Sequence, residues 1–212
     1  MEQLILDCPS AELLATDQRW WTIYDDSFPR KEREPESVIL KSLAISAGLA
    51  FRARLAGSTI GIASTHLLIQ PSAVFLVYLA ISRGHRGAGF GGPLMECAWS
   101  CSEARLREQG RSPLGLIWEV DIPGEASTNE ENLLRQRRVD FFRRHGGVLL
   151  HSTYRQPPVN GITVPMRLMF RPATGVPPPN AGTVDALVRA IYFEKYAAVN
   201  GLSRETLADL LL

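Results

Sequence analysis

The glycine-rich segment at residues 86–95 constrains this chain more than any other part of it. Four glycines stand within residues 87–92, an apolar run at 74–81 precedes them, and an amphipathic helical pattern follows. Glycine has no Cβ, so successive backbone N–H groups of such a loop can turn toward one point, and a following helix adds the partial positive charge of its N-terminus. The segment therefore predicts a strand–loop–helix unit that binds a phosphate-bearing group.

The spacing of these glycines admits two interpretations, of which the first is a dinucleotide-binding motif. Residues 87–92 (Gly-Ala-Gly-Phe-Gly-Gly) contain G-x-G-x-x-G. That motif requires its first glycine directly after a strand, an acidic residue about 20 positions later, and β-α-β units around it. Here the residues 82–86 separate Ile81 from Gly87, Glu119 lies too far along, and consecutive strand patterns precede the loop. The context argues against an NAD-binding domain.

The second interpretation is R-x-x-G-x-G, which Arg86, Gly89 and Gly91 match in register. This pattern resembles the acyl-CoA-binding signature of the GNAT superfamily of N-acetyltransferases. Residues 78–81 (Tyr-Leu-Ala-Ile) look like the central strand of that superfamily, and residues 140–147 (Asp-Phe-Phe-Arg-Arg-His-Gly-Gly) look like its late helix. The order of elements agrees over roughly residues 10–170.

The resemblance implies an α/β fold. We expect a GNAT-like, strongly twisted mixed sheet with an N-terminal antiparallel meander and a C-terminal hairpin, flanked by helices on both faces. The chain is then divided into a GNAT-like acyl-CoA-binding domain at 1–171, a proline-rich linker at 172–182 and a C-terminal helical extension at 183–212.

Hydrophobic periodicity and turn residues place the individual elements of this fold. A three-strand meander is expected to lead into the glycine loop, and the pair of late strands is expected to form an antiparallel hairpin. Helices are expected at 11–24, 37–46, 91–107, 130–145, 183–199 and 203–211, and strands at 49–55, 59–68, 73–81, 114–121, 148–154 and 164–170.

The resemblance also implies acetyl-CoA as the co-substrate, and no metal. In the superfamily the loop amides bind the CoA pyrophosphate, and the pantetheine lies in an opening between the strand before the loop and the next strand. The residues that this implies for cofactor binding are Leu79, Ala80, Ile81, Arg86, Gly87, Ala88, Gly89, Phe90 and Gly91.

Acyl transfer to an amine needs a base, and the strand at 114–121 offers two carboxylates. Side chains alternate along a strand, so Glu119 and Asp121 should face one side while Trp118 and Val120 face the other. Two nearby like charges raise one pKa, which suits a base at neutral pH. The alternatives are ion pairs with arginines of the following helix (Arg137, Arg138 or Arg143) and binding of the acceptor ammonium.

One departure from the superfamily concerns the proton donor to the leaving thiolate. The late helix usually carries a tyrosine there, and this position is Phe142 in the present chain. Water, Tyr154 or Tyr78 is then left to supply the proton, and Tyr154 is the residue we assign to the catalytic set with Glu119 and Asp121. An asparagine common earlier in that helix is also missing, with Arg135 near its place.

Composition limits the function classes. A net charge of +1 gives no electrostatic footprint for nucleic acid or a membrane surface. No apolar run reaches membrane-spanning length and residues 1–10 do not resemble a signal peptide, so a cytoplasmic protein is expected. Cys97 and Cys101 lack further metal ligands at a plausible spacing, and we expect buried thiols that point toward the core, which argues against a ping-pong route through either residue.

The sequence therefore predicts an N-acyltransferase that moves an acetyl group from acetyl-CoA to a primary amine by direct attack. The alternative is a catalytically silent acyl-CoA-binding sensor, which the missing tyrosine favours and the carboxylate pair opposes. A small-molecule amine is favoured over a protein acceptor. An apolar stripe at 184–192 is expected to pack back on the domain, and a homodimer contact or a cover over the acceptor cleft stays open.

Overall fold

The computed structural model describes residues 3–150 and 154–211 of the chain. It divides into two compact units. Unit 1 consists of Met1–Leu67 and Leu76–Ser112, and unit 2 consists of Leu68–Phe75 and Pro113–Leu212. Each is described by itself.

The sheet of unit 1 contains the expected antiparallel meander and one strand more. Its order is β1-β2-β3-β4, and β1 pairs with β2 and β2 with β3 in antiparallel register. The sequence analysis missed β1, because three residues are too short for an alternation pattern. The strands are β1 (Ile5–Asp7), β2 (Gly48–Leu55), β3 (Ser58–Ile69) and β4 (Ser72–Ile81).

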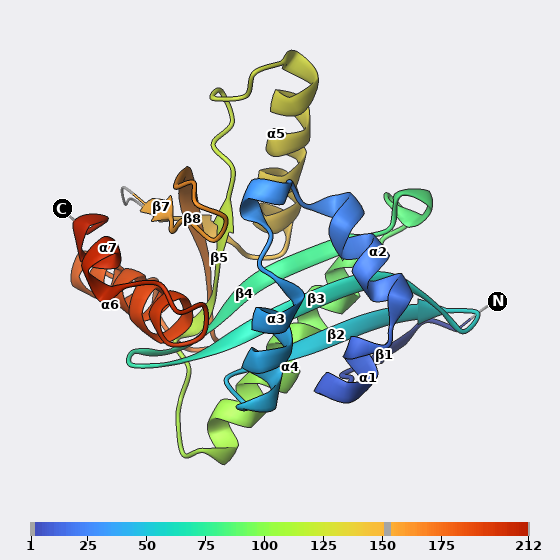
Figure 1. Cartoon of the computed structure of the whole chain (residues 1–212), viewed down its shortest axis with the longest axis horizontal. Helices are drawn as coiled ribbons and strands as arrows, with labels where there is room; N and C mark the ends of the chain where they lie inside the picture. Colours follow the sequence, from blue (N-terminus) through green and yellow to red (C-terminus); the bar gives the residue numbers. More distant parts are fainter. Residues whose placement is uncertain (1–2, 151–153, 212) are drawn as a thin grey trace. The chain divides into compact units, whose positions relative to one another are not determined.

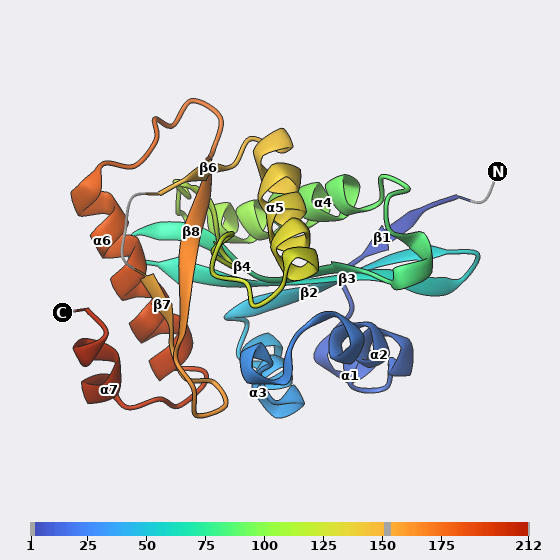
Figure 2. The same cartoon turned by 90° about the horizontal axis from the view of Figure 1, so that it is seen from above.

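Helices cover both faces of this sheet. Figure 2 shows α1 (Ala11–Ala15), α2 (Gln18–Ser27) and α3 (Glu36–Ala44) on one face and α4 (Gly91–Glu108) on the other. The single helix expected at 11–24 is in fact two helices. The first helix ends before Asp17. The Asp17 carboxylate accepts from the backbone N–H of Trp20 at 2.9 Å and so caps the N-terminus of α2.

Aromatic side chains of α2 form the core beneath the sheet. Trp20 is fully buried and Trp21 nearly so, with ring centroids 4.7 Å apart. Each indole N–H donates to a backbone carbonyl, Trp20 to Phe51 at 3.2 Å and Trp21 to Leu14 at 2.9 Å. Their polar atoms are therefore satisfied inside the core, and these rings are packing residues.

The strands of unit 2 assemble around β8 (Val164–Pro172). It pairs in antiparallel register with β5 (Gly115–Val120), with β6 (Val148–Leu149) and with β7 (Tyr154–Gln156). The expected C-terminal hairpin is confirmed as β7 and β8. The single strand expected at 148–154 is replaced by β6 and β7, and residues 151–153 lie outside the described part of the chain.

Helix α5 (Asn129–Arg144) packs on β5 through Phe142, whose ring lies 4.8 Å from that of Trp118. The helix ends at a glycine pair, as expected. Gly146 has a φ of 83°, and a Cβ on Gly147 would stand 2.6 Å from Trp118 Cζ2 and 2.9 Å from the Phe142 carbonyl oxygen. Only glycine fits at both positions without strain or displacement.

The C-terminal helices belong to the same compact unit as β5 and β8. Helix α6 (Ala181–Ala190) runs into a π-helix, η3 (Ile191–Ala197), and α7 (Arg204–Asp209) follows; they are the red helices of Figure 1. All five apolar residues of the 184–192 stripe are buried: Val184, Leu187, Val188, Ile191 and Tyr192. The domain boundaries expected at 171 and 182 stay a prediction.

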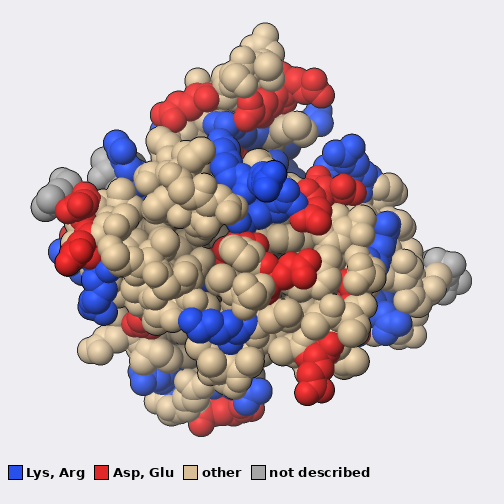
Figure 3. Space-filling view, in the orientation of Figure 1, with Lys and Arg blue, Asp and Glu red and all other residues tan. Residues whose placement is uncertain are grey.

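Charged side chains of both signs are scattered in patches over the face of the molecule drawn in Figure 3, between larger areas of uncharged residues. Among the residues that the structure describes, no helix combines the length and the apolar character needed to cross a bilayer.

Substitution of Gly147 by alanine is expected to destabilise the protein by about 1–3 kcal/mol, because the new methyl group overpacks the contact between Trp118 and α5. The matched control is Gly182→Ala in α6, where a Cβ meets nothing closer than 3.7 Å and alanine favours helix by up to about 1 kcal/mol. Urea unfolding of both variants checks this, and equal stability of the two would contradict it.

Candidate functional site

The glycine loop lies in unit 1 between β4 and α4, as the sequence predicts. After Ile81 comes a short 3-10 turn, η2 (Arg83–His85), and α4 then begins at Gly91. Gly87 and Gly89 have φ values of 81° and 85°, and a Cβ on either would meet no atom within 4 Å. The loop therefore has the left-handed backbone that requires glycine, and its surface faces open space.

The N-terminus of α4 fits an anionic group. Phe90 occupies the N-cap position and supplies no side-chain cap, and the first turn of this 18-residue helix contains no acidic side chain. The first backbone N–H groups of a helix have no partner within it, and the helix dipole favours a negative charge beside them. A diphosphate group fits this end of α4 and the preceding glycines.

Arg86 ties the loop to the end of β4. Its Nε donates to the carbonyl oxygen of Ile81 at 2.9 Å, and its Nη2 donates to Ser27 Oγ of α2 at 3.4 Å. The guanidinium thus fixes the start of the loop against two elements of unit 1. The geometry adds a structural role to the cofactor-binding role expected of this residue.

The last residues of β4 are half-buried, and one of them also packs in the core. Leu79, Ala80 and Ile81 all have intermediate exposure. Ile81 Cδ1 lies over Gly61 of β3, where a Cβ would stand only 2.5 Å away. Its side chain therefore helps to join β3 to β4, and its carbonyl group receives Arg86.

A cavity of about 170 Å³ adjoins the loop in unit 1, between α2 and η2. Its lining includes the basic side chains of Arg19, Arg83 and His85 and one acidic side chain, Asp26. The Nδ1 atom of His85 is hydrogen-bonded to Ser82 Oγ at 2.9 Å, which fixes the imidazole ring. The excess of cationic groups suits a phosphate more than a cation.

Tyr78 has a structural role. Its hydroxyl donates to the carbonyl oxygen of Glu32 and accepts from the N–H of Glu34, both at 3.0 Å. The hydroxyl of Tyr24 donates to the carbonyl oxygen of Glu34 at 2.9 Å. Burial raises the pKa of the Tyr78 phenol well above its usual value. With these backbone partners, Tyr78 anchors the segment between α2 and α3, and it is a poor candidate for the proton donor.

Unit 2 contains the expected base, Glu119, in a network of hydrogen bonds. The phenol of Tyr154 donates to Glu119 Oε1, and the amide of Gln156 donates to Oε2 at 2.9 Å. The phenol of Tyr196 donates to Oε1 as well, also at 2.9 Å. Donors to the ionised form stabilise a carboxylate over the carboxylic acid. Glu119 is thus half-buried on β5 and held as an acceptor.

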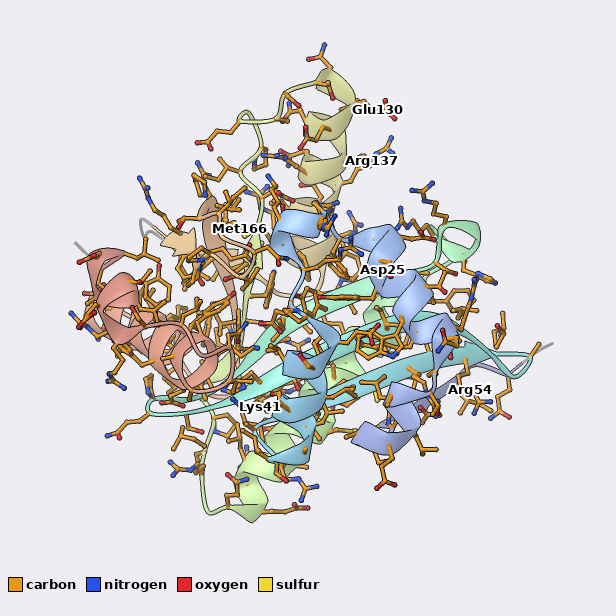
Figure 4. All side chains as sticks on the ribbon, in the orientation of Figure 1. Asp25, Lys41, Arg54, Glu130, Arg137 and Met166 are labelled. Atoms are coloured by element: carbon orange, nitrogen blue, oxygen red, sulfur yellow. The ribbon has the colours of Figure 1, made fainter. Side chains whose placement is uncertain are left out.

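The strand pairing explains how two of these donors reach Glu119. Tyr154 and Gln156 are two residues apart on β7, so both side chains lie on one face of the strand. Strand β7 pairs with β8 at Tyr154 and Met166. Strand β5 pairs with β8 two residues further along, at Glu119 and Leu168. Figure 4 labels Met166 beside β7 and β8.

Burial keeps two tyrosines of unit 2, Tyr154 and Tyr192, protonated. Removal from water raises the pKa of Tyr154 well above its ordinary value, and the nearby Glu119 charge adds to the effect. Burial likewise raises the pKa of Tyr192 to about 12, although its hydroxyl donates to the carbonyl oxygen of Arg155 at 2.7 Å. Both phenols are therefore neutral near pH 7.

Asp121 does not share the surroundings of Glu119. Strand β5 ends at Val120, so side-chain alternation does not extend to Asp121. Its carboxylate is paired with Arg138 and lies 3.9 Å from Arg135 Nε, both on α5. The expectation that both carboxylates face one side is wrong for this reason, and the ion-pair alternative describes Asp121. Its assignment to the catalytic set has no geometric support.

Phe142 and Arg135 of α5, which differ from the residues that the resemblance leads one to expect, have structural roles. Phe142 packs on Trp118 and on Phe141, with ring centroids 4.8 Å and 5.2 Å away. Arg135 donates from Nη1 to the Ile122 carbonyl oxygen at 3.1 Å and is bridged to Glu131 at 2.6 Å. Arg135 thus holds the start of the β5–α5 connection against the helix.

The cysteines are not all buried thiols. Cys8 and Cys101 are exposed and Cys97 is intermediate, so the expected inward orientation is wrong for Cys101. Burial raises the pKa of Cys97 to about 12, so this thiol is protonated and a poor nucleophile near pH 7. Within the described ranges, no group of three or more His, Cys, Asp or Glu side chains is arranged to hold a metal ion.

Sequence reasoning missed Gln156 and Tyr196. Gln156 lies two residues beyond the strand expected at 148–154, and only the observed strand β7 places it on the same face as Tyr154. Tyr196 is 77 residues from Glu119 and lies in a helix that the family resemblance did not cover. No local pattern identifies such a partner.

No family model and no curated protein matches this sequence. Solved structures match its fold. One is a protein from Bacteroides thetaiotaomicron described as a GNAT-family acetyltransferase, with 18% identity, a TM-score of 0.67, and coverage of 94% of this chain and 99% of that chain. Another is an aminoglycoside 6'-N-acetyltransferase complexed with coenzyme A, with 13% identity, a TM-score of 0.57 and coverage of 83% and 99%.

A third match is a GNAT-family acetyltransferase from Elizabethkingia anophelis with acetyl-CoA bound, with 12% identity, a TM-score of 0.50 and coverage of 80% and 98%. The chain has the GNAT fold, which confirms the expected α/β class. The Bacteroides match covers 94% of this chain, and the uncovered remainder is shorter than the segment 183–212. The likeness in fold therefore extends into the C-terminal helices.

Stability is expected to fall as the pH rises above about 10. Tyr192 keeps its proton up to about pH 12 in the folded chain, whereas an unfolded tyrosine loses it near pH 10. The unfolded state therefore binds fewer protons in this window, and stability present below pH 10 is lost as the pH rises to 12. Urea midpoints between about pH 9 and 11 measure the slope, and Tyr192→Phe should make it shallower; an unchanged slope would count against this.

Proposed function

We propose that this chain is an acetyl-CoA-dependent N-acetyltransferase that acts on a primary amine. The observation that carries the proposal is the glycine loop. Its left-handed glycines and uncapped helix N-terminus form a site for a diphosphate, on a chain with the GNAT fold. Acetyl-CoA has a diphosphate and supplies an acetyl group activated as a thioester.

Residues of unit 1 are proposed to bind the cofactor. The backbone N–H groups of residues 87–91 would hold the diphosphate, with Arg86 fixing the start of the loop. Leu79, Ala80 and Ile81 would line the pantetheine and acetyl end. Arg83, beside the loop, would add positive charge for the phosphates of CoA.

Glu119 is proposed as the base that takes a proton from the acceptor ammonium. Three donors keep it ionised, and a carboxylate must be ionised to accept a proton. The amine nitrogen then bonds to the acetyl carbon as the carbon–sulfur bond breaks. One nitrogen proton leaves with the base and a second is lost as the amide forms.

Tyr154 is proposed as the proton donor to the leaving thiolate. Its raised pKa keeps the phenol protonated, and its hydrogen bond to Glu119 allows the proton taken from the amine to be returned to the phenol oxygen. One amine proton would thus end on the sulfur of CoA, and the other would go to solvent. This route replaces the hydroxyl that Phe142 lacks.

A small-molecule amine is the proposed acceptor class. One structural neighbour is an aminoglycoside 6'-N-acetyltransferase, and aminoglycosides are small molecules that carry amines. The second candidate function, an acyl-CoA-binding sensor, is favoured by the phenylalanine at position 142.

Acetyl-CoA is expected to bind the intact protein, and the double variant Arg86→Glu, Gly89→Trp is expected to bind at least about tenfold more weakly. The variant places a carboxylate and a bulky ring where the diphosphate would lie. Isothermal titration measures both affinities. The matched control is Arg137→Glu, Gly57→Trp, with a left-handed glycine in a turn away from the loop. Equal weakening by the control would contradict a specific role of the loop.

Glu119→Gln is expected to lower kcat by about 10²–10⁴-fold while acetyl-CoA affinity stays unchanged, because the amide keeps the shape of the side chain and cannot take a proton. Release of free CoA thiol with a panel of amines measures the rate. Asp121→Asn is the control and should keep most of the activity, because Asp121 is paired with α5. Acetyl-CoA binding without any transfer would support the sensor instead.

A further inference from the structure

The C-terminal π-helix contributes a side chain to the Glu119 network. We propose that Tyr196 is a positioning residue for the base: it holds the Glu119 carboxylate for proton abstraction, which makes the C-terminal helix part of the catalytic machinery. This inference rests on the proposed N-acetyltransferase function, because it assigns Tyr196 a role in that reaction.

Packing fixes the Tyr196 phenol where it meets Glu119. The residue is 1% exposed, and its hydroxyl donates to Glu119 Oε1 at 2.9 Å. Its ring contacts that of Phe75 edge-on, with centroids 6.5 Å apart and planes inclined by 61°. A buried phenol has few alternative positions, so its hydrogen bond restricts the carboxylate as well.

The π-helix has two anchors in the turn before Tyr196. Tyr192 donates to the Arg155 carbonyl oxygen of β7 at 2.7 Å. The Glu194 carboxylate accepts from the backbone N–H groups of Ile69 and Gln70, at 2.6 Å and 3.0 Å. π-Helical turns are rare and occur frequently at functional sites. Here the turn aims three polar side chains, spaced two residues apart, at separate parts of unit 2.

The donors to Glu119 hold the orientation of its carboxylate. Oε1 accepts from both Tyr154 and Tyr196, and these two hydrogen bonds occupy its two lone pairs. Oε2 accepts from Gln156, so hydrogen bonds restrain both oxygens of the carboxylate. Removal of Tyr196 would free a lone pair of Oε1, let the carboxylate rotate, and make it easier to protonate.

The test compares Tyr196→Phe with Tyr192→Phe, which removes a hydroxyl from the same π-helix but no donor to Glu119. For each protein, kcat and kcat/KM are measured across pH with the best amine found for the wild type, and acetyl-CoA affinity is measured by titration. Tyr196→Phe is expected to lower kcat by about 10–100-fold and to move the acidic limb of the profile to higher pH, without weakening acetyl-CoA binding. Tyr192→Phe should leave the acidic limb in place.

If Tyr196→Phe keeps the kcat and the acidic limb of the wild type, the inference is overturned and the proposed function stands. A wild type that transfers acetyl to no amine would overturn the proposed function first, and the inference with it. A double-mutant cycle on urea unfolding with Tyr196→Phe and Glu119→Gln checks the contact independently of activity. Additive effects in this cycle would overturn the contact itself.

Discussion

The arrangement of unit 2 depends on the need to satisfy one partly buried carboxylate. Removing a carboxylate from water costs several kcal/mol unless hydrogen-bond donors replace the water. For Glu119 these donors lie 35, 37 and 77 residues along the chain. Strand β7 must therefore present Tyr154 and Gln156 on one face, and the C-terminal helix must direct a phenol inward. A charge on one strand thus specifies how two later elements are placed.

The parts of the fold that the sequence predicted are those encoded locally. The glycine loop, α4 and the strands before it follow from periodicity, from glycines and from the position where the helix starts, each of which is a local signal. The positive φ values of Gly87 and Gly89 agree with the reason why glycine is needed there. The same reasoning identified the C-terminal hairpin, because turn residues separate two apolar alternating runs.

The parts that the sequence did not predict depend on contacts between distant elements. Asp121 lies one residue beyond β5, so a strand boundary decides that it meets arginines of α5. Asp17 splits a continuous apolar pattern by capping α2. The hydroxyl that the superfamily places on the late helix is absent at Phe142, whereas β7 and η3 each bring a phenol to Glu119. Patterns in a single sequence indicate which face of an element is apolar and where the element ends. They do not indicate which side chains of distant elements form pairs.

The Tyr78 anchor links the segment between α2 and α3 to the end of β4 within unit 1. One hydroxyl bonds to the backbone of both Glu32 and Glu34, and the same residue immediately precedes the 79–81 segment of β4. Any molecule that orders the segment between α2 and α3 thereby stiffens the end of β4, and the reverse holds equally. A displacement at either end of this contact is therefore passed to the other through a single phenol.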